Sequence, residues 1–326
     1  MNKKYYLGID TSNYTTSVAA IDEDGNLFFD VRDVLSVGNG ERGMRQSQAL
    51  FNHVNNLPDV ICGVGRIAAE KGLVLGGVGV SSKPRPVEGS YMPCFLPGVS
   101  AGAAIAEVNN VPLFKFSHQE GHLAAALSGN EELINSEKAF AAYHLSGGTT
   151  EILLCRGTEI IDIVGGTKDI SLGKLIDRTG VAMGLKFPCG KEMDGMAMTC
   201  RTDIINPFCK IKTADGLMNV SGIETQIQNF ISAHEGLDKA LISGNVLSRC
   251  AEAIIDSIHQ ISEKYDIENV LFMGGVSSSS FIKTKLISDF IPAEGRNTVL
   301  YFGRERYCPD NAVGIAILAR SRCPEK

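Results

Sequence analysis

The feature that most constrains this fold is a strand–turn–strand pattern that occurs twice, far apart in the chain. Residues 5–10 are apolar up to the final Asp10, and a polar turn then leads into a second apolar segment at 17–21. The same order returns at 139–155, where two apolar segments flank the turn 146–150. Two such halves predict a duplicated α/β architecture of two lobes, with a ligand cleft between the lobes.

The length of 326 residues agrees with two domains. We expect an N-terminal lobe at 1–137, a C-terminal lobe at 138–309 and a C-terminal helix at 310–326 that packs back on the first lobe. Apolar periodicity also predicts helical regions over 45–70 and 171–260.

Charge and cysteine content narrow the class of protein. The net charge of -6 provides no general basic field, so an RNA would have to meet a local patch or arrive through a partner protein. The nine cysteines are scattered singly and form no CxxC pair, which is typical of a reducing compartment. No apolar run is long enough to cross a bilayer, so we expect a cytoplasmic protein without membrane association.

Three turns rich in glycine and hydroxyl residues each follow an apolar strand, at 10–17, 146–150 and 274–277. Backbone N–H groups and hydroxyls in such turns bind phosphate, and the third turn opens a helix. Each turn alone is also consistent with an ordinary tight turn. None fits the P-loop or the GxGxxG pattern. Together the three turns favour binding of ATP or a related adenine nucleotide, in a fold that is neither a P-loop nor a Rossmann fold.

A pair of histidines forms the candidate metal motif. Ser117 and Glu120 have the spacing of a capping box, which places His118 and His122 one turn apart on one helix face. Asp310 is the candidate third ligand. Two imidazoles and one carboxylate suit zinc or iron, with magnesium as a further alternative. An isolated HxxxH is also consistent with two surface histidines.

These segments together resemble the TsaD/Gcp family of tRNA threonylcarbamoyl transferases, once described as peptidases. The resemblance is carried, in the family's own order, by GIDTS at 8–12, FSHQEGHL at 116–123, LSGGTT at 145–150, LGKLIDR at 172–178 with FPCG at 187–190, MGGVS at 273–277 and CPDNA at 308–312. It implies the duplicated actin-like/sugar-kinase (ASKHA) fold with a nucleotide in the cleft between its lobes.

The resemblance also implies site residues and partners. The metal ligands would be His118, His122 and Asp310. Asp10, whose place in the first turn lets it hold a metal-bound water near phosphate oxygens, is the candidate catalytic residue. The nucleotide-binding positions would be Ser12, Ser146, Gly147, Gly148, Thr149, Asp177, Gly190, Gly274, Gly275 and Ser279. Family members transfer a threonylcarbamoyl group from threonylcarbamoyl-adenylate to the adenosine beside the anticodon of certain tRNAs. We therefore expect contact with tRNA through a partner protein, and either TsaB/TsaE-like subunits or a homodimer.

The chain departs from the family pattern at several places. Where the family has Cys-Asp-Glu, this chain has Asn13, Tyr14 and Thr15, so an acidic pair is absent. Ser279 replaces a family asparagine. The segment 82–97 replaces a short glycine-rich loop and adds Lys83 and Arg85. We interpret the chain as a divergent paralogue with an altered donor or acceptor, although the segment is also consistent with a solvated surface insertion.

The sequence offers two alternative functions. A non-catalytic nucleotide-binding subunit of such a complex is the main alternative, and retention of the metal ligands argues against it. A metallopeptidase is disfavoured because the sequence lacks HExxH.

Overall fold

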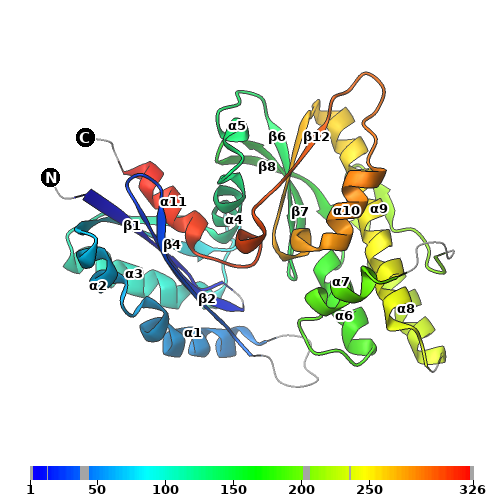
Figure 1. The fold of residues 1–326 in the computed structure, drawn as a ribbon, viewed down its shortest axis with the longest axis horizontal. Coiled ribbons are helices and arrows are strands. Elements are labelled where there is room, and N and C mark those ends of the chain that lie inside the picture. The colour runs from blue at the N-terminus through cyan, green and yellow to red at the C-terminus, as the bar shows by residue number, and fades with distance from the viewer. Residues whose placement is uncertain (1–2, 13, 37–43, 201–205, 235, 324–326) are drawn as a thin grey trace. The chain divides into compact units, whose positions relative to one another are not determined.

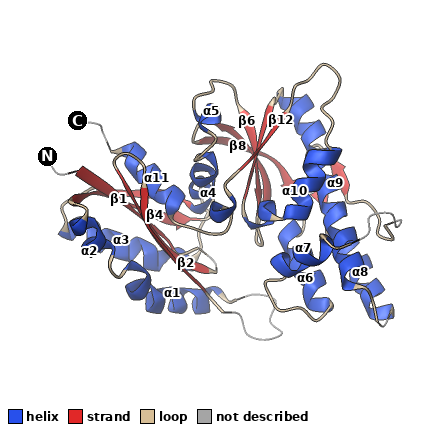
Figure 2. Cartoon of the chain, in the orientation of Figure 1, coloured by secondary structure: helices blue, strands red, loops and turns tan. Residues whose placement is uncertain are grey.

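The computed structural model describes residues 3–12, 14–36, 44–200, 206–234 and 236–323 (Figures 1 and 2). Asn13, one of the predicted departures, lies outside the described residues. The described chain forms two compact units. The first contains the described residues up to 129 together with 304–323, and the second contains those between 130 and 303.

The first unit is built on a five-stranded sheet with the order β3-β2-β1-β4-β5. Its strands are β1 (Lys3–Asp10), β2 (Thr15–Asp22), β3 (Leu27–Val34), β4 (Leu73–Lys83) and β5 (Leu113–Ser117). The first three form an antiparallel meander, whereas β4 and β5 run parallel to β1. Asp22 closes the β2–β3 turn because its carboxylate accepts the backbone N–H groups of Asp24 and Asn26.

Helices cover both faces of this sheet. Alternate residues of β1 point to opposite sides, and because both sets are apolar, each face packs against helices. Tyr5, Leu7 and Ile9 pack against one group of helices, while Tyr6 packs against the other. The first group is α1 (Gln46–Ile61), α2 (Val64–Glu70) and α3 (Leu96–Val108), with the short turn η1 (Pro93–Phe95) before α3. The second group is α4 (His118–Leu127) and α11 (Val313–Arg322), with η3 (Glu305–Tyr307) before α11.

The helical region predicted over 45–70 is confirmed, and it consists of two helices, because the chain breaks between α1 and α2. Gly63 lies there with φ 88°, a conformation that favours glycine and ends the first helix.

Glycines allow α11, red in Figure 1, to pack closely on its neighbours. A Cβ at Gly314 would overlap the backbone carbonyl of Gly121 in α4, and one at Gly8 would overlap that of Ala312. Close backbone approach of this kind requires glycine. It brings the chain segment just before α11 next to the start of α4.

The second unit contains a seven-stranded sheet with the order β12-β11-β6-β7-β8-β10-β9. Its strands are β6 (Phe140–Leu145), β7 (Thr150–Arg156), β8 (Glu159–Thr167), β9 (Lys212–Ala214), β10 (Leu217–Asn219), β11 (Asn269–Met273) and β12 (Val299–Phe302). The series β8-β7-β6-β11-β12 repeats both the order and the strand directions of the first sheet. The duplication predicted from the strand–turn–strand pattern is therefore confirmed.

A large core joins this sheet to its helices. The helices of the unit are α5 (Glu131–Ile134), α6 (Leu172–Ala182), α7 (Gly190–Ala197), α8 (Ser221–Ala233), α9 (Lys239–Tyr265) and α10 (Ser280–Asp289), with η2 (Gly275–Ser278) before α10. The helical region predicted over 171–260 is wrong as a continuous feature, because loops and the β9–β10 hairpin interrupt it. Among the described helices, none has both the length and the apolar character needed to cross a membrane.

Candidate metal centre and phosphate loops

The start of α4 is fixed by the predicted capping box, which the structure confirms. Ser117 Oγ accepts the N–H of Glu120 at 3.2 Å, and the Glu120 carboxylate accepts the N–H of Ser117 at 2.7 Å. The helix therefore begins directly after β5. His118 and His122 then project from one helix face, one turn apart.

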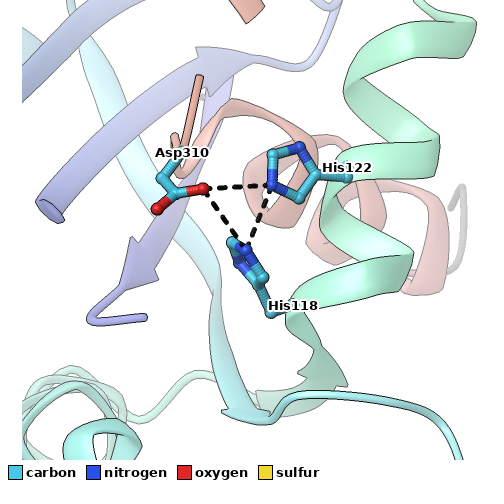
Figure 3. A group of neighbouring side chains, drawn as sticks. All are labelled: His118, His122 and Asp310. Atoms are coloured by element: carbon cyan, nitrogen blue, oxygen red, sulfur yellow. Dashed lines mark hydrogen bonds and ion pairs between the residues drawn. The ribbon is translucent and has the colours of Figure 1, made fainter. Parts of the chain in front are cut away.

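The structure brings the three predicted metal ligands together within the first unit (Figure 3). His122 Nε2 lies 3.1 Å from His118 Nε2 and 3.3 Å from Asp310 Oδ1. His118 Nε2 lies 3.5 Å from the same Asp310 oxygen. Tetrahedral coordination with bonds of about 2.0–2.1 Å separates ligand atoms by about 3.3 Å. The spacing of the three atoms thus fits one first-row metal ion.

Asp10 lies behind the first of these ligands. Its Oδ2 is 2.8 Å from His118 Nδ1 and also accepts the Ser81 hydroxyl at 2.7 Å, while its Oδ1 accepts the N–H of Ser12 at 2.7 Å. A carboxylate on the far nitrogen of an imidazole fixes the tautomer and orients the other nitrogen toward a metal. Predicted as a catalytic residue, Asp10 is placed by the structure where it positions His118.

Ser81 was missed by the sequence reasoning. The only signal was a hydroxyl residue directly after an apolar strand, and its partner Asp10 lies 71 positions away in the chain.

Electrostatic coupling sets the charges of this cluster. Burial lowers the pKa of His118, but the Asp10 carboxylate and then Asp310 more than offset this and raise it to about 10. The pKa of His122 is lowered by burial and by the charge on His118. Burial raises the pKa of Asp310, yet its contacts with both histidines leave it well below its usual range.

Metal uptake should therefore release a proton. With its pKa raised to about 10, His118 is expected to be protonated in the metal-free protein at neutral pH, and a metal would displace this proton from Nε2. We expect the apparent affinity for Co²⁺ to rise with pH, by about tenfold per pH unit for one displaced proton between about pH 6 and 8. Competition with a chromogenic chelator at several pH values measures this. An affinity independent of pH would contradict the protonation assigned to His118.

The predicted phosphate loop of the second unit joins β6 to β7. Ser146 and Thr149 close it, since the Ser146 N–H donates to the Thr149 carbonyl at 2.8 Å and the Thr149 N–H to Ser146 Oγ at 3.0 Å. Gly147 and Gly148 remain exposed at its tip. The start of α6 supports the loop, because Ser171 Oγ donates to the Gly147 carbonyl at 2.7 Å. Its exposed backbone can contact an anionic ligand.

Other predicted nucleotide positions lie around this loop. Parallel pairing of β6 with β11 brings Gly274, with φ 92°, against the carbonyl of Leu145, and Gly275 follows it exposed. On α6, Asp177 Oδ2 approaches Gly147. Asp177 Oδ1 accepts the backbone N–H of Cys189, the residue before Gly190, at 2.8 Å. Burial raises the pKa of Asp177. The structure thus gathers these positions at one end of the second sheet.

Two of the predicted nucleotide-binding residues, Ser279 and Ser12, do not belong to this group. Ser279 caps α10, because its hydroxyl donates to the Asp194 carboxylate and its Oγ accepts the N–H of Ile282 at 3.1 Å. The sequence reasoning missed this capping role. Ser12 belongs to the first unit, where its side chain is buried and its Oγ has no hydrogen-bond partner within the described part of the chain.

Comparison with known proteins agrees with the motifs. The sequence profile of TsaD, tRNA N6-adenosine threonylcarbamoyltransferase, matches residues 48–317. The chain belongs to the TsaD family. Proteins called tRNA N6-adenosine threonylcarbamoyltransferase from Streptococcus agalactiae serotype III and Cytophaga hutchinsonii are 27% and 26% identical to it. These alignments cover 98% and 95% of this chain, and 93% and 89% of the relatives.

Solved structures establish the fold independently of the TsaD relatives. Nucleotide-bound HypF has a TM-score of 0.60 at 12% identity, covering 98% of this chain and 55% of HypF. A glucokinase of the ROK family from Streptomyces griseus has a TM-score of 0.54 at 12% identity, covering 97% of this chain and 99% of the glucokinase. The predicted duplicated actin-like/sugar-kinase fold is confirmed.

One departure of this chain from the family pattern, the segment 82–97, lies near the candidate metal ligands. Pro84 in the replaced segment accepts the N–H of Gln119, next to His118, at 3.2 Å. The Cys94 carbonyl accepts the Thr11 hydroxyl at 2.8 Å, and the Phe95 ring lies 6.4 Å from that of His118. The segment 82–97 therefore borders the metal centre along several of its residues.

Two further departures lie at the start of the second strand of the same sheet, where Tyr14 directly precedes β2 and Thr15 is its first residue. Tyr14 is half-buried, and Thr15 is buried. These are the two positions at which the motif resemblance predicts an acidic pair in the family.

Proposed function

We propose that this chain is a nucleotide- and metal-dependent transferase of a threonylcarbamoyl or related carbamoyl group. The observation that carries the proposal is the convergence of His118 Nε2, His122 Nε2 and Asp310 Oδ1 in a protein of the TsaD family. The donor set favours zinc or iron over magnesium, which prefers oxygen ligands. Once bound, the metal would act as a Lewis acid toward an oxygen of the donor.

The residues of the protein would supply the remaining functions. Backbone N–H groups of Gly147, Gly148 and Gly275 would bind phosphate oxygens, and Asp177 would accept hydrogen bonds from the sugar. Asp10 would hold His118 in the tautomer whose Nε2 binds the metal. A non-catalytic subunit needs no such ligand set, so the transferase accounts better for these contacts.

We further propose that the donor or the acceptor differs from that of the relatives. The contacts of segment 82–97 with Gln119 and His118 support this, because a segment at the metal centre can select the group that approaches it. Loss of the acidic pair at Tyr14 and Thr15 removes repulsion toward a negatively charged group. Lys83 and Arg85 add cations that can pair with such a group.

A complementation assay tests the change of substrate. This chain is supplied as the sole TsaD-family member to cells that require threonylcarbamoylated tRNA, and the modified nucleoside is measured. We expect no restoration from the wild type although it binds ATP and metal, and restoration from a chimera that carries the short glycine-rich loop in place of 82–97. Full restoration by the wild type would contradict the altered substrate and support the standard tRNA reaction. Failure of the chimera as well would point to a missing dedicated partner.

The proposed setting is the cytoplasm, in complex with partner proteins. None of the nine cysteines, all within the described residues, is part of a disulfide, which agrees with a reducing compartment. With a net charge of -6, the chain would meet tRNA through a partner, and either a TsaB/TsaE-like subunit or a second copy of the chain would fill that role.

A further inference from the structure

Asp310 lies in a different kind of chain segment from the other two candidate metal ligands. His118 and His122 are on α4, a regular helix whose start is fixed by its capping box. Asp310 lies between η3 and α11, where the chain forms neither a helix nor a strand. A metal site needs its ligands held to within about 0.5 Å. Contacts other than a regular backbone ladder must therefore fix the position of this carboxylate.

The side chain of Asn311 makes such contacts on both sides of Asp310. Its Nδ2 donates to the carbonyl of Tyr307 at 2.8 Å and to that of Pro309 at 2.9 Å. The second of these carbonyls belongs to the peptide bond that leads into Asp310. On the other side, Asn311 Oδ1 accepts the backbone N–H of Val313 at 3.0 Å. One buried amide, 4% exposed, thus ties together the backbone before and after the ligand.

The hydrogen bond from Val313 also joins this segment to α11. Val313 is the first residue of the helix, and Ala312 before it has no polar side-chain atom that could cap it. Asn311 supplies the missing acceptor. Because α11 packs closely on α4, the helix start to which Asn311 is bonded also lies against the helix that carries both histidines. Asn311 therefore couples the segment of the third ligand to the scaffold of the first two.

A second contact fixes the earlier part of the same segment. Arg32 on β3 donates from Nη1 to the carbonyl of Arg306 at 2.8 Å. This contact acts only before Asp310, whereas Asn311 acts on both sides of it. Loss of the Asn311 amide would leave two carbonyls and one N–H without these partners, and leaving buried backbone groups unpaired costs free energy. The segment would rearrange, and the Asp310 carboxylate would move with it.

We propose that Asn311 is a positioning residue of the metal centre, whose amide holds Asp310 at the distance from both histidines that one metal ion requires. Asp310 Oδ1 lies 3.3 Å from His122 Nε2 and 3.5 Å from His118 Nε2. Groups that orient a ligand from outside the coordination sphere commonly change metal affinity by about 10- to 100-fold. The inference rests on the metal site of the proposed function, but not on the identity of the transferred group.

The test is Co²⁺ binding to the full chain, measured at fixed pH by competition with a chromogenic chelator and by the visible absorption of the bound ion. Asn311→Ser keeps an oxygen that can cap α11 but removes the donors to the two carbonyls. This variant should bind Co²⁺ about tenfold more weakly and show shifted absorption bands. If Asn311 served only to start α11, the variant would keep both the affinity and the bands of the wild type.

The matched control is Asn206→Ser in the second unit. Asn206 makes the same kinds of bonds, since its Nδ2 donates to the carbonyl of Asn245 at 2.7 Å and its Oδ1 accepts the N–H of Phe208 at 3.0 Å. This control should bind Co²⁺ like the wild type. Thermal unfolding of the metal-free proteins verifies that both variants are folded.

Asn311→Asp provides a second test of the same donors if the serine variant does not fold. It keeps the size of the side chain and the acceptor for the N–H of Val313, and it should also shift the Co²⁺ bands. Wild-type affinity and bands in the Asn311 variants, or an equal loss in Asn206→Ser, would overturn the role of Asn311 while leaving the proposed function intact. A wild type that binds no Co²⁺ would overturn the metal site and this inference together.

Discussion

His122→Ala is expected to remove the bound metal from the purified protein. The substitution deletes one of three protein ligands, whose Nε2 lies 3.1 Å from His118 Nε2 and 3.3 Å from Asp310 Oδ1. The two remaining ligands cannot hold the ion at comparable strength, so we expect a loss of affinity of about 100-fold or more. Elemental analysis after gel filtration should show about one metal per wild-type chain and almost none in the variant.

Control variants make this result specific. His234→Ala removes an exposed imidazole of the second unit, which stacks on Phe230, and should leave the metal content unchanged. Asp310→Ala should behave like His122→Ala, because it removes the carboxylate that both histidines contact. Equal metal content in the wild type, His122→Ala and Asp310→Ala would show that the cluster is not the metal site.

Gly314→Ala is expected to have the largest effect on stability. The added Cβ would overlap the carbonyl oxygen of Gly121, a backbone atom of α4 that cannot turn away as a flexible side chain can. Helix α11 must then shift, at a cost of about 3 kcal/mol in the free energy of unfolding. Because Asp310 lies just before α11, the same shift should also weaken metal binding. Thermal unfolding together with Co²⁺ titration measures both effects.

The control for this variant is Gly65→Ala within α2, where a Cβ would meet no atom within 4 Å. Replacing an unhindered helical glycine with alanine should stabilise the protein slightly, by up to about 1 kcal/mol. If Gly314→Ala unfolded like the wild type and retained its metal affinity, the close packing of α11 on α4 would not be needed to assemble the site.

Local sequence patterns predicted the parts of the site that depend on neighbouring residues. The spacing of Ser117 and Glu120 was enough for the capping box, and hence for the shared face of His118 and His122. The repeated strand–turn–strand pattern predicted the duplication, because each half begins with the same antiparallel pair. The order of the family motifs supplied Asp310, which no local pattern links to the histidines.

Contacts between distant residues could not be predicted in this way. The hydrogen bonds of Asp10 with Ser81 and His118 join residues 71 and 108 positions apart. Strand β8 was not predicted, because most residues of its N-terminal half are exposed and show no clear apolar alternation. Ser279 was assigned by motif position alone, whereas its hydroxyl caps a helix beside Asp194.

Anomalous diffraction from crystals grown with ATP and divalent metal tests the central claim most directly. Data collected at the zinc and iron absorption edges locate the ion and identify the element in one experiment. Our account predicts one strong peak within bonding distance of His118 Nε2, His122 Nε2 and Asp310 Oδ1. Metal-replete crystals with no peak among these three atoms would contradict it.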